Sequence, residues 1–143
     1  MKKSTFATLV LLLMGINIFA QSEKKLADIK FDTTTYDMGT FAADTAIIKC
    51  QFVYTNTGEV PLYIHQVFTS CGCTERSFST APTMPGKSDT IFVTYNGKNK
   101  APGYVRKSIT VHCNTKKEMI KLYIKGDMLP AKITPVENVE IEE

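Results

Sequence analysis

Apolar and polar residues alternate along most of the chain after residue 28. Between residues 48 and 55, Ile48, Cys50, Phe52 and Tyr54 share one face of a strand, and mostly polar residues occupy the other. This period predicts β-strands with one buried face, because successive side chains of a strand point to opposite sides. Similar patterns predict strands over residues 29–31, 36–41, 61–68, 89–95, 105–113 and 120–124, with a further short strand near 76–79.

Turn residues separate these short strands. Asn56-Thr57-Gly58 follows one of them, and other Gly, Pro and Asn residues follow or precede the rest. Outside the first 20 residues no stretch has the apolar spacing of a helix. Six or seven strands over about 100 residues predict an all-β fold, a β-sandwich over residues 29–128.

The first 20 residues have the pattern of a secretory signal peptide. A basic start at Lys2 and Lys3 precedes a mostly apolar run over residues 6–19, and a small residue stands before a polar junction. We predict cleavage between Ala20 and Gln21; the alternative is an uncleaved anchor. Residues 21–28 then form a linker, and residues 129–143 an acidic C-terminal tail.

The charge of the exported chain is close to neutral. The 143 residues include 17 basic and 14 acidic ones, and loss of Lys2 and Lys3 leaves 15 basic residues. This balance gives no support to nucleic-acid binding, which needs a concentrated basic face. We expect export without a membrane anchor after cleavage, to the periplasm or alternatively to the cell surface or medium. Disulfides form in such oxidising compartments.

Two of the four cysteines, Cys50 and Cys113, lie on the apolar faces of their predicted strands. If those strands belong to opposite sheets, the two side chains can meet across the core, as in immunoglobulin domains. A bridge between them is therefore expected. The alternative is a pair of buried thiols that act as small hydrophobic residues.

Cys71-Gly72-Cys73 lies in a polar segment after a strand. Gly72 is expected to permit the kink that brings the two sulfurs together, and the resulting small ring would be readily reduced. One hypothesis is a small structural or protective disulfide. A second is a redox-active or Cu(I)-binding thiol pair, since thiolates bind soft ions. The remaining alternatives are free thiols or pairing with Cys50 or Cys113.

The sequence contains no recognisable catalytic set. His65 and His112 stand alone on strands and are interpreted as surface residues, and no zinc spacing, nucleophile elbow or phosphate-binding loop is present. We therefore expect no enzymatic activity, no cofactor and no metal site.

Several fragments together resemble a known family. The most specific are the Asn56-Thr57-Gly58 turn and the run Ser70, Cys71, Gly72, Cys73 and Thr74. They are similar to a family of secreted bacterial domains of unknown function with the Hydin-type immunoglobulin-like fold, distantly related to major sperm protein. The resemblance implies a seven-stranded sandwich and export from a Gram-negative bacterium. It implies no established activity.

The expected function is that of an exported, non-catalytic binding or scaffolding module of the cell envelope. An exposed edge strand can capture an extended segment of a protein partner through main-chain hydrogen bonds. The alternative function is thiol-redox or Cu(I)-binding chemistry at Cys71 and Cys73.

Overall fold

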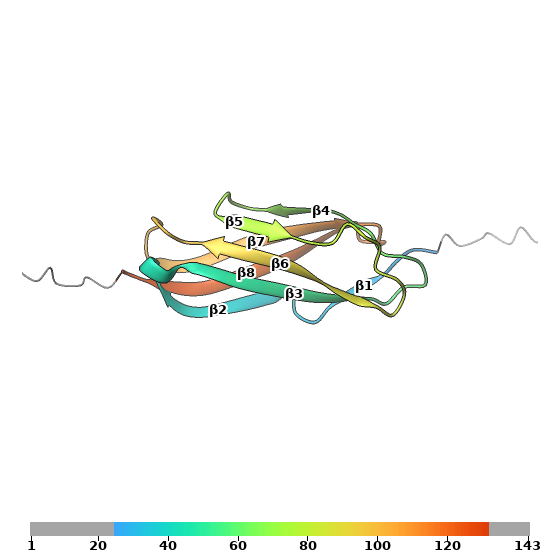
Figure 1. Ribbon diagram of the computed structural model, residues 1–143, viewed down its shortest axis with the longest axis horizontal. Helices are drawn as coiled ribbons and strands as arrows, with labels where there is room; N and C mark the ends of the chain where they lie inside the picture. Colours follow the sequence, from blue (N-terminus) through green and yellow to red (C-terminus); the bar gives the residue numbers. More distant parts are fainter. Residues whose placement is uncertain (1–24, 132–143) are drawn as a thin grey trace, which may run out of the picture.

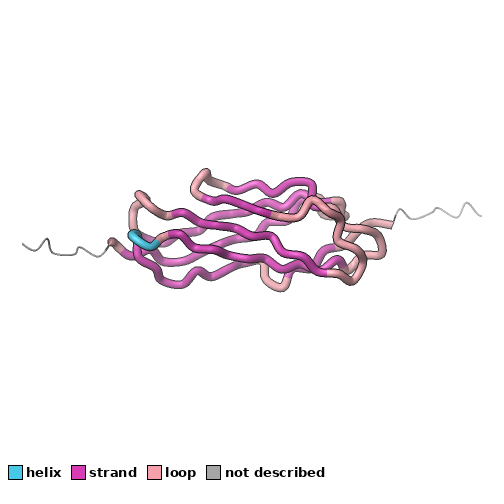
Figure 2. Tube along the Cα trace, in the orientation of Figure 1, coloured by secondary structure: helices cyan, strands magenta, loops and turns pink. Residues whose placement is uncertain are grey.

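The computed structural model describes residues 25–131, which form a two-layered β-sandwich (Figure 1). The strands are β1 (Ile29–Phe31), β2 (Thr35–Ala42), β3 (Ile47–Asn56), β4 (Ile64–Thr69), β5 (Thr74–Ser77), β6 (Ser88–Asn96), β7 (Gly103–Cys113) and β8 (Met119–Leu129). One sheet has the order β1-β3-β6-β5 and the other β2-β8-β7-β4. A short 3₁₀ helix, η1 (Ala43–Thr45), joins β2 to β3, and loops join the other strands (Figure 2).

The expectation of seven strands was wrong, since the described residues form eight. The chain leaves one sheet after β1 and enters the other at β2, which makes two edge strands. The segment after the cysteine motif also pairs fully, with Thr74 opposite Tyr95 and Ser77 opposite Phe92. Strand identity was nevertheless well predicted, because each sheet has one buried and one wet face.

The core lies between the two sheets. Alternate residues of β3, β6, β7 and β8 point into it, and the largest fully buried side chains include Tyr54, Tyr95 and Phe52. Burial raises the pKa values of the Tyr54 and Tyr95 hydroxyls above their ordinary value. The two-residue period therefore produces the predicted core.

The parallel pairing of β2 with β8 depends on close backbone approach. A side chain at Gly126 would place its Cβ 2.7 Å from the carbonyl oxygen of Gly39. Gly39 has φ +66°, at the point where the register between the two strands shifts. Glycine at both positions lets β2 lie directly against β8.

The predicted signal peptide and its cleavage site at Ala20 and Gln21 lie outside the described residues, as does most of the acidic tail. Within the expected linker, Ala27 is buried and forms a bridge with Thr115. In residues 25–131 no helix is long and apolar enough to cross a membrane.

Candidate functional site

The cysteine motif forms the corner at which the chain passes from one sheet to the other. β4 is the edge strand of one sheet and β5 the edge strand of the other. Ser70 to Cys73 connects them, and the N–H of Thr74 donates to the carbonyl oxygen of Cys71 at 3.2 Å. We name this segment, Ser70 to Thr74, the disulfide corner.

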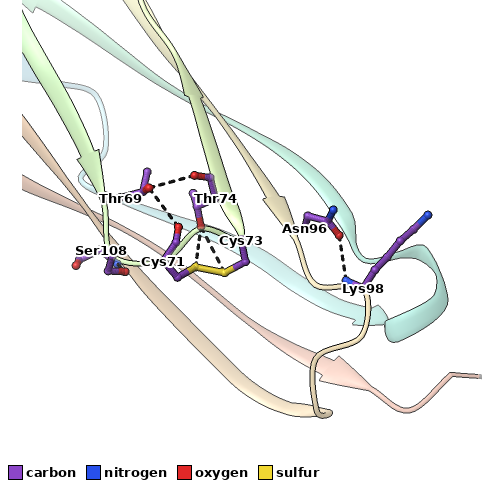
Figure 3. Close-up of a disulfide and its surroundings, with 8 residues drawn as sticks. Thr69, Cys71, Cys73, Thr74, Asn96, Lys98 and Ser108 are labelled. Carbon is purple, nitrogen blue, oxygen red and sulfur yellow. Dashed lines mark hydrogen bonds between the residues drawn. A yellow bond between two sulfur atoms is a disulfide. The ribbon is translucent and has the colours of Figure 1, made fainter.

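Cys71 and Cys73 are joined by a disulfide, with their Cα atoms 5.3 Å apart. The hydroxyl of Thr74 lies 3.4 Å from Sγ of Cys71, and the hydroxyl of Thr69 lies 3.1 Å from the carbonyl oxygen of Thr74. Figure 3 shows the Thr74 hydroxyl facing both sulfur atoms and the Thr69 hydroxyl facing the carbonyl oxygens of Cys71 and Thr74. These hydrogen bonds occupy the polar groups around the bond, which is the arrangement of a structural turn.

Gly72 does not have the role that the sequence suggested. Its φ lies outside the left-handed region, and a Cβ built there would meet nothing within 4 Å. The turn itself therefore does not require glycine. The open space above Gly72 instead leaves the disulfide, whose two residues are half-buried, accessible from outside.

A shallow hollow of about 320 Å³ lies against the disulfide corner. Besides the motif it is lined by Glu75, Asn96, Lys98 and Lys100. The N–H of Asn96 donates to the carbonyl oxygen of Cys73 at 2.8 Å, and Oδ1 of Asn96 accepts from the N–H of Lys98 at 3.1 Å. These bonds fix the backbone from Asn96 to Lys98 next to the disulfide corner, while the Lys98 side chain points away from the sulfur atoms (Figure 3). Lys98 and Lys100 together outnumber Glu75, so the lining of the hollow has a net positive charge.

The disulfide corner also ends the pairing along one edge of β7. The last contacts join Ser70 to Ser108, whose N–H donates to Oγ of Ser70 at 3.1 Å. Beyond them the chain turns away, and no strand of residues 25–131 pairs with this side of β7 from Gly103 to Lys107. By the two-residue period, the main-chain groups of Tyr104 and Arg106 face this open edge.

The side chains beside the open edge are exposed and partly fixed in position. Tyr104 is 64% exposed, and the guanidinium carbon of Arg106 lies 4.0 Å from the ring centroid of Tyr123. This cation–π contact holds a positive charge on the outer face of the sheet. Sequence patterning did not indicate Tyr104, Arg106, Lys98 or Lys100, because they join the site only through strand register.

The expected bridge between Cys50 and Cys113 is absent, and both are buried free thiols. They do face the core from opposite sheets, but at different heights. Met128, which pairs with Gly103 at the start of β7, and Ala46, which immediately precedes β3, both lie beside Gly97, so β7 and β3 begin at the same end of the sandwich. Cys113 lies ten residues along β7 from Gly103, whereas Cys50 lies only four residues along β3 from Ala46. This difference of six residues separates the two cysteines by roughly 20 Å along the strand direction. Burial raises the pKa of the Cys50 thiol to about 11.

His65 and His112 are not isolated, contrary to the interpretation from sequence. Their ring centroids lie 5.4 Å apart at the far end of β4 from the disulfide corner. No signal in the sequence could have found this pair, since 46 residues separate them and only the β4–β7 register joins them. Among residues 25–131, no group of three or more His, Cys, Asp or Glu side chains could hold a metal ion.

Comparison with solved structures shows related sandwiches. A protein of unknown function from Porphyromonas gingivalis W83 is 19% identical over 78% of this chain, with a TM-score of 0.62, and the match spans about half (51%) of that protein. A PapD-like domain of human CEP192 is 10% identical over 83% of this chain and 99% of its own, with a TM-score of 0.57. The periplasmic chaperone SfaE is 12% identical over 76% of this chain and 61% of its own, with a TM-score of 0.51.

These low identities show the fold alone, a β-sandwich like those of a PapD-like domain and a periplasmic chaperone. No curated protein matches the chain. A family model described as "Protein of unknown function (DUF1573)" matches residues 29–128, the whole sandwich. The run Ser70 to Thr74 lies within this match and forms the corner between the two sheets. Because the match covers more than half of the chain, the chain belongs to the DUF1573 family.

Proposed function

We propose that this protein is an exported, non-catalytic binding module of the bacterial cell envelope that captures an extended segment of a partner protein at the open edge of β7. The observation that carries this proposal is the abrupt end of β4 at the disulfide corner. It leaves main-chain donors and acceptors of a long strand without a partner among the described residues.

Main-chain hydrogen bonding supplies the affinity in this proposal. A segment entering beside Tyr104 and Arg106 would extend the line of β4 and pair with β7 in its place. Strand addition of this kind satisfies the open edge, and pockets for alternate side chains give specificity. Natural proteins usually protect such edges, so the free edge on this strand of 11 residues is available as a docking surface.

Charge near the edge favours an acidic segment. Lys98 and Lys100 line the hollow at the disulfide corner, and Arg106 stands on the outer face of β7. Glu75 is the acidic residue of the hollow. Complementary charge would steer association and fix the orientation of the partner more than it would raise the affinity.

Export to the periplasm is part of the same proposal, with the cell surface or medium as alternatives. It is supported by the basic and apolar start of the chain and by the disulfide between Cys71 and Cys73. N-terminal sequencing of the protein from a periplasmic fraction should give Gln21 as the first residue. A chain that keeps residues 1–20 and stays in the membrane would contradict this part.

A photo-crosslinking amino acid at position 104 tests the edge directly. The same group at Phe92, which is 53% exposed on the opposite sheet, is the matched control. Crosslinking to an envelope protein should occur from position 104 and not from position 92. Arg106→Pro removes a main-chain donor of the open edge and should abolish it, whereas Arg106→Gln should only weaken it. Equal crosslinking from both positions, or crosslinking unaffected by Arg106→Pro, would refute the proposal.

The second candidate function is thiol exchange or Cu(I) binding by Cys71 and Cys73. It is favoured by one observation, namely that the half-exposed disulfide opens to a hollow that Lys98 and Lys100 also line, because nearby positive charge stabilises thiolates. Equilibration with glutathione buffers, followed by alkylation and mass spectrometry, separates the candidates. A disulfide that opens under these conditions and then binds Cu(I) supports the second function. One that stays closed leaves strand capture as the function.

A further inference from the structure

The chain has two histidines, and the fold brings both to one place. Ile64 pairs with Cys113 and Gln66 with His112, so His65 is the extra residue of a β-bulge. Bulges re-aim side chains and are frequent next to functional sites. Here the bulge turns His65 toward His112 and places the two ring centroids 5.4 Å apart.

Met119 carries a thioether sulfur on β8, the strand next to His112. It is the cross-strand partner of His112, and the N–H of Cys113 donates to the carbonyl oxygen of Glu118 in the neighbouring rung. His112 and Met119 therefore form a non-hydrogen-bonded pair, the kind in which opposing side chains lie closest. Met119 is 60% exposed, so its thioether is available on the same outer face as the imidazole.

The surroundings of the pair indicate which ion would fit. A hollow of about 710 Å³ beside both histidines is lined by Lys25, Lys116 and Glu118 among others. Lys25 is ion-paired with Glu59, and Lys116 and Glu118 carry opposite charges, so the wall offers no excess negative charge to balance a divalent ion. Imidazole and thioether ligands suit copper, and the soft thioether selects Cu(I).

We propose that His65, His112 and Met119 form a Cu(I) site on the outer face of the β4-β7-β8 sheet. Each imidazole would give one nitrogen and Met119 its thioether sulfur, which makes a three-coordinate site from neutral ligands. The site is separate from the cysteine pair, since His65 lies at the start of β4 and the disulfide corner lies beyond its end. It does not depend on the strand-capture function.

Competition with a chromogenic Cu(I) chelator tests the site. The protein should be the exported form without a polyhistidine tag, reduced copper should be maintained by ascorbate, and a parallel Zn(II) titration should be made. We expect one Cu(I) per chain and tighter binding of Cu(I) than of Zn(II). Because the chain has two histidines, NMR can follow both imidazoles individually, and both signals should shift with one equivalent of Cu(I).

Substitutions assign the ligands. His65→Gln and His112→Gln should each weaken Cu(I) binding at least about tenfold, the least that loss of a supporting group costs a metal site. Met119→Leu should weaken Cu(I) binding similarly and leave Zn(II) binding unchanged. Met84→Leu is the matched control, since Met84 is 52% exposed and stands outside the site, and it should change neither affinity. Circular dichroism should be unchanged for all four variants.

Repeating the titration in a Cys71→Ser/Cys73→Ser background excludes the cysteine pair as the binding site. Binding that persists there supports the proposal. Binding that disappears there, or that both histidine variants retain in full, overturns it. Tighter binding of Zn(II), or unchanged Cu(I) affinity in Met119→Leu, overturns the assignment to Cu(I).

Discussion

The two ends of β4 carry different chemistry. At its end, the sulfurs of Cys71 and Cys73 are bonded to each other, and Thr69 and Thr74 make hydrogen bonds around them. At its start, His65 and His112 are brought together on the outer face beside an exposed Met119. The cysteine motif, which is conspicuous in the sequence, has its sulfur and polar groups paired within the fold. The two histidines and Met119, which no motif marks, are the ligands of the proposed Cu(I) site.

The comparison shows that a motif can serve geometry rather than chemistry. The disulfide corner takes the chain from one sheet to the other and so ends β4 early, which frees the edge of β7. No sequence motif marks the histidines, and they lie close together only because of the β-bulge at His65 and the register between β4 and β7. We therefore expect that removing polar groups that are hydrogen-bonded within the fold lowers the free energy of unfolding, whereas removing the His65 or His112 imidazole does not.

The largest effect on the free energy of unfolding is expected at Asn56. Its side-chain amide is hydrogen-bonded at both its nitrogen and its oxygen, in the turn that leads toward β4. Its buried amide donates to the carbonyl oxygens of Val60 and Thr83 at 2.8 and 2.9 Å and accepts from the N–H of Gly58 at 2.9 Å. Asn56→Ala should lower the free energy of unfolding by roughly 4 kcal/mol, because three backbone groups lose their partner. Urea unfolding measures this. A loss below 1 kcal/mol would contradict it.

The next effect is an alkaline loss of stability from the Cys50 thiol, which unlike the bonded sulfurs of the corner can ionise. Burial raises its pKa from 9.0 to about 11, so the unfolded chain loses this proton at lower pH than the folded one. This stability is therefore present below pH 9 and falls by roughly 2 kcal/mol as pH rises to 11. Urea unfolding at several pH values measures the slope.

Cys50→Ala is the control for this pH dependence. It should remove most of the slope between pH 9 and 11 and leave the smaller contribution of the buried Tyr54 and Tyr95 hydroxyls, whose raised pKa values have the same sign. An unchanged slope in Cys50→Ala would show that another group titrates.

A smaller effect is expected from removing the disulfide. Cys71→Ala/Cys73→Ala opens a very small ring, for which the chain-entropy model gives roughly 1.5 to 2 kcal/mol. The hydrogen bond from Thr74 to the carbonyl oxygen of Cys71 is independent of sulfur and should keep the corner formed. Thermal unfolding measures the loss. Complete unfolding of the double variant would mean that the corner depends on the bond far more than its size indicates.

The smallest effect is expected at the other end of β4. His65→Gln and His112→Gln should change the free energy of unfolding by less than about 0.5 kcal/mol without metal, as is usual for surface positions. Adding Cu(I) should stabilise the wild-type protein more than either variant, because a ligand that binds the folded state raises its stability by an amount that grows with how tightly it binds. Large losses in metal-free protein would make the pair structural, like the disulfide corner.

The strands could be predicted from sequence, and the site mostly could not. Alternation around Phe52 and Tyr54 reveals a strand because one face is buried, and that needs no knowledge of its neighbours. The predicted bridge between Cys50 and Cys113 is absent because an inward-facing position does not determine where along the strand direction a residue lies. The open edge at Arg106 and the histidine pair depend on register between distant strands, which a local pattern does not contain.

The central claim is that the cysteine motif shapes an edge and that the edge does the binding. Crosslinking from position 104 should be compared in folded Cys71→Ala/Cys73→Ala and folded Arg106→Pro protein. We predict that the partner is still captured by the first variant and lost from the second. Loss of capture from the cysteine variant together with full capture by Arg106→Pro would contradict the account.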